Sequence, residues 1–172
     1  MFQAAAPALS TDKATFYRDL DTQLRGLLTD ERDWIANASN LSSLLYLMMP
    51  DLNWAGFYFT RPTQTGSELV LGPFQGKPAC VRIPVAPVAR GVCGAAASQR
   101  VTQRVHDVHD FPGHIACDSA SNSELVVPLV KEGRVLGVLD LDSPNVGRFD
   151  ADDQAGVERL VATFLAMSDT PR

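Results

Sequence analysis

The chain has 172 residues, of which 45% are hydrophobic and 20% charged, so it holds one domain's worth of sequence with enough apolar material for a core. Its 15 Lys and Arg residues against 20 Asp and Glu give a net charge of −5. This balance excludes a generally basic nucleic-acid-binding surface and a polybasic membrane-binding surface. Three cysteines are too few, and odd in number, for a secreted disulfide scaffold.

Neither an export signal nor a membrane span is expected. The first basic residue is Lys13, so the amino terminus lacks the positive region of a signal peptide. The densest apolar run, at residues 44–49, falls far short of the ~20 residues that span a bilayer. We therefore expect a cytoplasmic protein, whose thiols are either buried and inert or reactive.

The first half of the chain predicts a loose tail, two helices and two strands. Residues 1–11 are rich in Ala and Pro, which indicates a flexible tail. Thr11 is the expected cap of the first helix, and Pro50 ends the second. An aromatic strand and a short strand follow. The predicted helices and strands lie at residues 12–28, 30–48, 53–60 and 68–71.

The second half predicts four more strands, a short helix and a terminal helix. Glycines around Cys93 allow a short helix at 91–98, and the polar stretch 106–123 reads as a long loop, a feature often functional in compact domains. The terminal helix begins near Asp150. We expect an α+β fold, a single domain at 12–168 and a tail at 169–172. The four strands are predicted at 80–85, 101–105, 124–130 and 135–142, the last two as a hairpin.

The cysteines, at positions 80, 93 and 117, form no Cys-x-x-Cys pair, which argues against a thioredoxin-like motif or a zinc ribbon. Cys117 lies in a polar loop, where an accessible thiolate can act as a nucleophile. Cys93 lies at a predicted helix start, where the helix dipole favours a thiolate. Cys80 opens a strand and is equally compatible with the core. For each cysteine the alternative is a buried, inert thiol.

A group of carboxylates is the second candidate site. Asp140 and Asp142 are two apart on a predicted strand, so they share a face and continue the row of Leu136 and Val138. Solvent or a helix cap would satisfy them; alternatively they line a pocket that binds an ammonium group or shares a proton. Glu124 begins the neighbouring strand and could join them.

Other polar and aromatic residues have weaker signals. His106, His109 and His114 lie in one loop with Cys117, but no helical His-x-x-x-His pattern orients them for zinc, which favours loop hydrogen bonding and no metal. Trp54 and Tyr58 are four apart on a strand and share a face. They are either core residues or the wall of an apolar pocket.

At this point the sequence resembles the free methionine-(R)-sulfoxide reductases, which are built on the GAF domain. The resemblance covers about residues 16–166. It rests on five segments: Asn-Trp-Ala-Gly-Phe-Tyr at 53–58, Leu-Gly-Pro-Phe-Gln-Gly-Lys-Pro-Ala-Cys at 71–80, Arg-Gly-Val-Cys-Gly at 90–94, the Cys117 loop from 113 to Glu124, and Asp-Leu-Asp-Ser-Pro at 140–144.

The resemblance implies a GAF-like domain with a central antiparallel sheet of about six strands flanked by helices. It also implies reduction of free methionine (R)-sulfoxide, with Cys117 attacking and Cys80 or Cys93 resolving the sulfenic acid as a disulfide. Thioredoxin, itself linked to NADPH, would restore the dithiol, with no bound cofactor and a homodimer as the assembly. The implied substrate-binding residues are Glu124, Asp140, Asp142, Trp54 and Tyr58.

One departure from the family's pattern leaves the resolving cysteine open. Cys80 and Cys93 are 13 positions apart, against about ten in the family, because residues 84–89 repeat Pro-Val-Ala. The alternative function is a non-catalytic GAF module that senses a small ligand, and a third is a dimerisation module. Oxidation of two thiols during turnover distinguishes the reductase from both.

Overall fold

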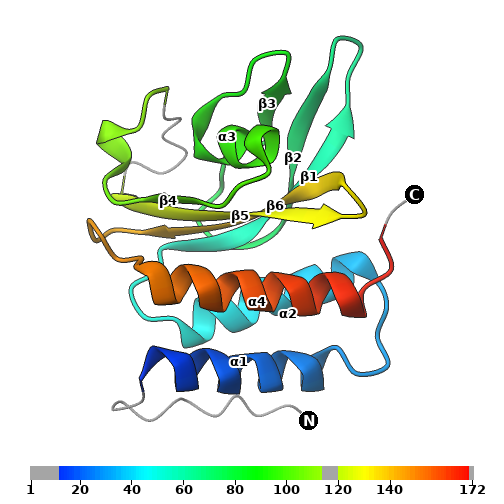
Figure 1. Cartoon of the computed structure of the whole chain (residues 1–172), viewed down its shortest axis with the longest axis vertical. Helices are drawn as coiled ribbons and strands as arrows, with labels where there is room; N and C mark the ends of the chain where they lie inside the picture. Colours follow the sequence, from blue (N-terminus) through cyan, green and yellow to red (C-terminus); the bar gives the residue numbers. More distant parts are fainter. Residues whose placement is uncertain (1–11, 114–119, 171–172) are drawn as a thin grey trace.

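The computed structural model describes residues 12–113 and 120–170, and among them one six-stranded antiparallel sheet organises the fold (Figure 1). Its strands run in the order β3-β2-β1-β6-β5-β4. The α+β class and the GAF-like sheet of about six strands expected above are therefore confirmed. The strands are β1 (Trp54–Pro62), β2 (Ser67–Gly76), β3 (Arg82–Ala86), β4 (Gln103–Val105), β5 (Ser123–Lys131) and β6 (Arg134–Ser143).

The helices divide between the two faces of the sheet (Figure 1). Three long helices lie on one face, and the short α3 lies on the other beside β3. No helix in the described part of the chain is long and apolar enough to cross a membrane. The helices are α1 (Lys13–Leu27), α2 (Trp34–Met48), α3 (Gly91–Gln99), the 3₁₀ turn η1 (Val108–Asp110) and α4 (Ala151–Met167).

Each face of the sheet has its own hydrophobic core. The larger core joins the three long helices to alternate residues of the central strands, including Phe57 and Leu139. The smaller core lies under α3 and includes Trp54, Tyr58 and Cys93. Alternation along β1 sends Trp54 and Tyr58 to the α3 face and Phe57 to the helical face, as the period of two requires. The site described below belongs to the smaller core.

The helix starts differ from the sequence predictions because aspartates cap them. Asp12, not Thr11, caps α1, and its side chain accepts a hydrogen bond from the Thr15 backbone N–H. Asp33 caps α2 in the same way, so this helix begins at Trp34 and not near residue 30. An aspartate oxygen satisfies the free N–H groups of a first turn as well as threonine does, so spacing alone could not choose between neighbouring caps. The predicted tail at 1–11 lies outside the described residues.

Strand pairing corrects two sequence predictions. β2 extends from residue 67 to Gly76 and not only over 68–71, because it follows β1 across a register shift to the Trp54–Gly76 pair. Leu129 of β5 pairs with Gly137 of β6, but the next residue of β5, Val130, pairs with Val135. Leu136 is therefore the extra residue of a β-bulge in β6. A bulge moves a residue to the other face. Leu136 therefore packs against the helical core, and the expectation that it shares a face with Asp140 is wrong.

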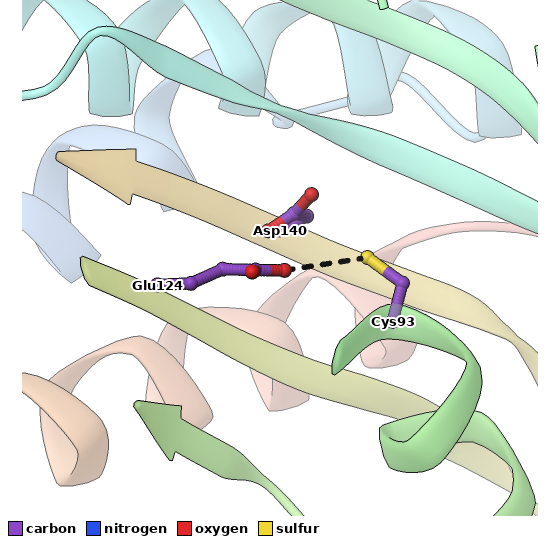
Figure 2. Close-up of side chains that lie close together, drawn as sticks. All are labelled: Cys93, Glu124 and Asp140. Carbon is purple, nitrogen blue, oxygen red and sulfur yellow. Dashed lines mark hydrogen bonds between the residues drawn. The ribbon is translucent and has the colours of Figure 1, made fainter. Parts of the chain in front are cut away.

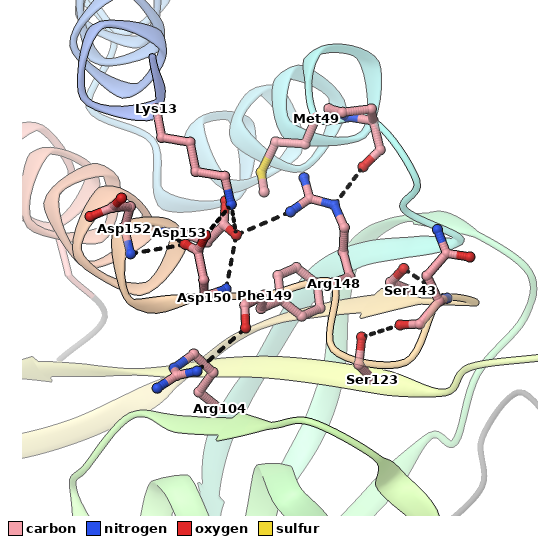
Figure 3. Close-up of polar contacts among 12 residues, drawn as sticks. Lys13, Met49, Arg104, Ser123, Ser143, Arg148, Phe149, Asp150, Asp152 and Asp153 are labelled. Carbon is pink, nitrogen blue, oxygen red and sulfur yellow. Dashed lines mark hydrogen bonds and ion pairs between the residues drawn. The ribbon is translucent and has the colours of Figure 1, made fainter.

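A buried ionic cluster joins α1 to α4 below the sheet (Figure 3). Asp153 is 1% exposed and sits in the first turn of α4. Its carboxylate accepts from Lys13 at 2.6 Å, from Arg148 at 3.1 Å and from the Tyr17 hydroxyl at 2.8 Å. The Asp150 backbone N–H also donates to it, so donors from α1 and from the segment just before α4 together satisfy this buried charge and join α1 to the start of α4.

Candidate functional site

Two of the predicted carboxylates lie buried side by side on the α3 face of the sheet. β5 and β6 are paired so that Glu124 lies opposite Asp142, and Asp140 lies two residues further along β6 on the same face. Glu124 is 5% and Asp140 6% exposed, whereas Asp142 is half-buried. The hairpin register therefore brings together the three acids that the sequence predicted as one group.

A cysteine completes this group from the opposite side. Cys93 lies in the first turn of α3, and its thiol contacts Glu124 Oε1 at 3.9 Å (Figure 2). One ligand atom from each of Cys93, Glu124 and Asp140 lies within 4.8 Å of the others, and all three residues are buried. Figure 2 shows the thiol pointing from α3 toward the strands that carry Glu124 and Asp140.

Burial dominates the protonation of this group. It raises the pKa of Glu124 well above its ordinary value, and repulsion from Asp140 adds to the rise. Burial also raises the pKa of Asp140, to about 6. Two carboxyl groups this close cannot both ionise readily in an apolar site, so one of them retains a proton near neutral pH.

Cys93 is a neutral thiol. Burial raises its pKa well above the ordinary value, and the charges of Asp140 and Glu124 raise it further. The expectation that the helix start favours a thiolate at Cys93 is therefore wrong. A helix dipole supplies only about half a unit charge at its end, and desolvation together with two neighbouring acids outweighs it. A protonated thiol is also a poor metal ligand, since zinc binds the thiolate.

Stacked aromatic rings form one wall beside the acids. The rings of Trp54 and Tyr58 stack with their centroids 5.7 Å apart. The ring of Phe74 also stacks on Trp54, with a centroid distance of 5.4 Å. Burial, with Asp140 and other acids nearby, raises the pKa of Tyr58, so its phenol stays protonated. A small cavity of about 10 Å³, space for roughly one water, touches both aromatic rings and both aspartates. Trp54 and Tyr58 are thus core residues and cavity wall at once.

Lys77 is a lining residue that the sequence analysis did not single out. It follows β2 in the segment that leads to Cys80, and it lines the same small cavity together with Pro78 and Ala79. Its backbone carbonyl accepts a hydrogen bond from Trp54 Nε1 at 3.1 Å. The sequence offered only its position between the end of β2 and Cys80. The path of that connection is fixed by the tertiary structure.

Cys80 differs from Cys93. Cys80 is half-buried in the segment before β3 and is bonded in a disulfide, whereas Cys93 is a free thiol. The strand β3 begins at Arg82 and not at residue 80 as predicted. Cys80 therefore belongs to the connection between β2 and β3. Cys117 lies outside the described residues. The hydrogen bond from the Arg90 N–H to the Pro84 carbonyl, at 3.1 Å, closes the repeated Pro-Val-Ala segment into a loop of its own.

The described histidines take part in loop hydrogen bonding and packing. His109 Nδ1 lies 2.7 Å from the Asp107 carboxylate, and Asp107 also accepts from the His109 backbone N–H. The His106 ring packs against Gly147, where a Cβ atom would come within 2.4 Å of it. The His109 contact confirms the loop hydrogen bonding favoured by the sequence, whereas the His106 ring is held by packing. His114 lies outside the described residues.

Comparisons with known proteins agree with this fold. The GAF domain family model matches residues 41–165, and the chain belongs to the GAF domain family. The chain is 51% identical over 161 residues to the free methionine-R-sulfoxide reductase of Escherichia coli (strain K12), covering 92% of this chain and 93% of that one. Within the GAF domains, the chain therefore belongs to the free methionine-R-sulfoxide reductase family.

Two further relatives carry the same name. The free methionine-R-sulfoxide reductase of Saccharomyces cerevisiae is 42% identical, over 87% of this chain and 83% of that protein. The solved structure of free methionine-R-sulfoxide reductase from Neisseria meningitidis, in complex with its substrate, has a TM-score of 0.85 at 41% identity and covers 96% of this chain and 95% of that chain. The family suggested by the motifs is thus confirmed.

Proposed function

We propose that this protein reduces free methionine (R)-sulfoxide to methionine, with its own thiols as the reductant. The observation that carries the proposal is the juxtaposition of a proton-retaining pair, Glu124 and Asp140, with a wall made by Trp54 and Tyr58. The sequence likeness to free methionine-R-sulfoxide reductases over nearly the whole chain supports the same substrate.

In the first step the Cys117 thiolate attacks the sulfur of the sulfoxide. The sulfur–oxygen bond breaks, the oxygen ends on Cys117 as a sulfenic acid, and methionine leaves with its sulfur reduced by two electrons. The sulfoxide oxygen must gain a proton for this step. The pair of Glu124 and Asp140 holds such a proton near neutral pH, because burial raises both pKa values.

The same acids select a free amino acid. An ionised carboxylate among Glu124, Asp140 and Asp142 pairs with the substrate's ammonium group, which a methionine inside a polypeptide does not have. The stacked rings of Trp54 and Tyr58 contact the methyl group and the thioether arm. Specificity for the free amino acid then follows from one charge contact and one apolar contact.

In the second step a resolving thiol attacks the sulfenic acid, a disulfide forms and water leaves. We assign this thiol to Cys80. In support, Cys80 is bonded in a disulfide, whereas Cys93 is free, buried and protonated beside Glu124. Since the thiolate is the nucleophile, Cys80 suits the resolving step better than Cys93 does. Cys93 then serves as a hydrogen-bond donor that holds Glu124 in place.

The remaining steps complete a cycle. Thioredoxin, reduced by NADPH, returns the disulfide to two thiols, and no bound cofactor takes part. We propose a cytoplasmic location, where such a reductant is present. A homodimer through the helical face agrees with the exposed apolar side chains of α2, Ile35, Tyr46 and Leu47.

The decisive experiment is an assay of the purified protein with each sulfur diastereomer of free methionine sulfoxide, coupled to thioredoxin. We expect turnover with the R form alone, and two thiols lost per methionine formed in a single turnover. Cys117→Ser abolishes methionine formation, and Glu124→Gln lowers turnover well over tenfold. A wild-type protein that binds the sulfoxide without consuming thiols would instead be a sensor, and full activity in Cys117→Ser would remove that residue from the chemistry.

A further inference from the structure

A second and much larger cleft lies away from the acids, between the two hairpin ends of the sheet. It has a volume of about 670 Å³, within the range of small-molecule sites. β1 and β6 are paired only as far as Phe59 and Gly137. Beyond that pair the β1–β2 hairpin and the β5–β6 hairpin separate, as Figure 1 shows, and the cleft opens between their ends.

The cleft carries an excess of positive charge. Three arginines line it: Arg61 from β1, Arg100 from the end of α3 and Arg134 from β6. Its lining includes no Asp or Glu, and within the described ranges none of the three guanidinium groups has an ion-pair partner. The chain as a whole carries a net charge of −5. The three arginines therefore make this cleft locally positive on a protein that is negative overall.

Unpaired strand edges and an aromatic base complete the cleft. Residues 60–62 of β1 and 134–136 of β6 line the opening without pairing to each other, and the Thr60 carbonyl there accepts a hydrogen bond from Arg61 Nη1 at 3.1 Å. Trp34 and Phe59 line the cleft with ring centroids 5.4 Å apart, and Leu136 lies beside them. Three arginines in one cleft that also has an apolar lining are suited to an oxyanion attached to a ring or another apolar group.

We propose that this cleft binds a phosphate-bearing small molecule, at a site separate from the reductase site. A phosphate group carries about two negative charges and several acceptor oxygens, and it therefore matches three guanidinium groups better than a single carboxylate does. The proposal does not depend on the reductase activity, because no residue of the cleft lines the cavity beside the acids.

Isothermal titration of the full chain with sodium pyrophosphate and with adenosine monophosphate tests the proposal. We expect saturable binding of one molecule per chain, weakened at least tenfold in the double variant Arg100→Gln with Arg134→Gln. Arg159→Gln, which removes an exposed arginine on α4 outside the cleft, is the matched control and leaves the affinity within twofold.

The two ligands distinguish the source of the phosphate. Tighter binding of the nucleotide indicates that the ring rests on Trp34, and equal binding indicates a site for the bare oxyanion. The absence of saturable binding for both ligands, or equal weakening in Arg159→Gln, would overturn the proposal.

A different contact carries a second inference, which rests on the proposed function. The indole N–H of Trp54 donates to the Lys77 carbonyl at 3.1 Å, three residues before Cys80. The same ring packs over Gly76, where a Cβ atom would come within 2.8 Å of it. Trp54 is 3% exposed and Lys77 is exposed, so this part-buried hydrogen bond ties a surface segment to a core side chain.

The geometry points to Trp54 as a positioning residue for Cys80. The hydrogen bond fixes the connection between β2 and β3, and a resolving thiol must meet the sulfenic acid within the narrow geometry of a disulfide. Trp54 therefore acts in both steps: its ring contacts the substrate, and its N–H holds the segment that carries the second thiol.

Trp54→Phe keeps an aromatic ring and removes the N–H. The Trp54 ring also contacts the substrate, so the closure is measured without substrate. We expect diamide to close the disulfide of this variant at least fivefold more slowly than that of the wild type. Trp34→Phe is the matched control, because Trp34 Nε1 has no hydrogen-bond partner in the described part of the chain.

Two outcomes have different meanings here. If the wild-type protein releases no methionine, the proposed function fails. If diamide closes the disulfide of Trp54→Phe at the wild-type rate, the positioning role fails.

Discussion

Replacing Asp140 by Asn tests the electrostatics of the site through stability. Asp140 is 6% exposed, and one of its oxygens, Oδ1, has no hydrogen-bond partner in the described residues. Burial raises its pKa from 3.8 to about 6. A group whose pKa is raised by folding binds its proton more tightly in the folded state. Its contribution to stability is complete below pH 3.8 and is lost as the pH rises through about 6.

The magnitude follows from the same shift. A rise from 3.8 to about 6 corresponds to about 3 kcal/mol of folding free energy lost at high pH. Asn carries no charge at any pH and avoids this loss. We therefore expect Asp140→Asn to be more stable than the wild type above pH 7, by about 3 kcal/mol, or roughly 6–12 °C in Tm for a chain of this size. Near pH 4 the advantage disappears.

Urea denaturation of both proteins at several pH values between 4 and 8 measures this difference. Asp19→Asn, which removes an exposed carboxylate on α1, is the control and shows little change with pH. A stability difference between Asp140→Asn and the wild type that stays constant from pH 4 to pH 8 would refute the reasoning. So would a variant that is less stable than the wild type at pH 8.

Three further variants test other parts of the structure. Cys93→Ala continues to turn over with thioredoxin, because the thiol is protonated and only supports Glu124; a stop after one methionine per chain would contradict this. Asp153→Ala destabilises the fold by about 2–4 kcal/mol in thermal unfolding, since it removes the carboxylate partner of Arg148 and of the Tyr17 hydroxyl and leaves Lys13 with Asp150 alone. The exposed neighbour variant Asp152→Ala costs less than about 1 kcal/mol. Gly137→Ala lowers Tm by several degrees, because its Cβ would come within 2.1 Å of the Tyr58 carbonyl oxygen; an unchanged Tm would show that β1 and β6 can separate there.

The sequence alone determined the class of fold and the composition of the site. Alternation of apolar residues located the aromatic face of β1, because successive side chains of a strand point to opposite faces whatever packs on them. Spacing of two put Asp140 and Asp142 on one face. These relations are local, so a linear pattern can express them.

Tertiary structure alone decided the register of the strands and the protonation of the buried acids and of Cys93. The bulge at Leu136 depends on how β5 and β6 pair, and no residue of β6 announces it. Cys93 looked like a thiolate from its place at a helix start, but burial against Glu124 and Asp140 keeps it neutral. Desolvation and the charges of distant residues are properties of the folded interior, and these set both pKa values and partners.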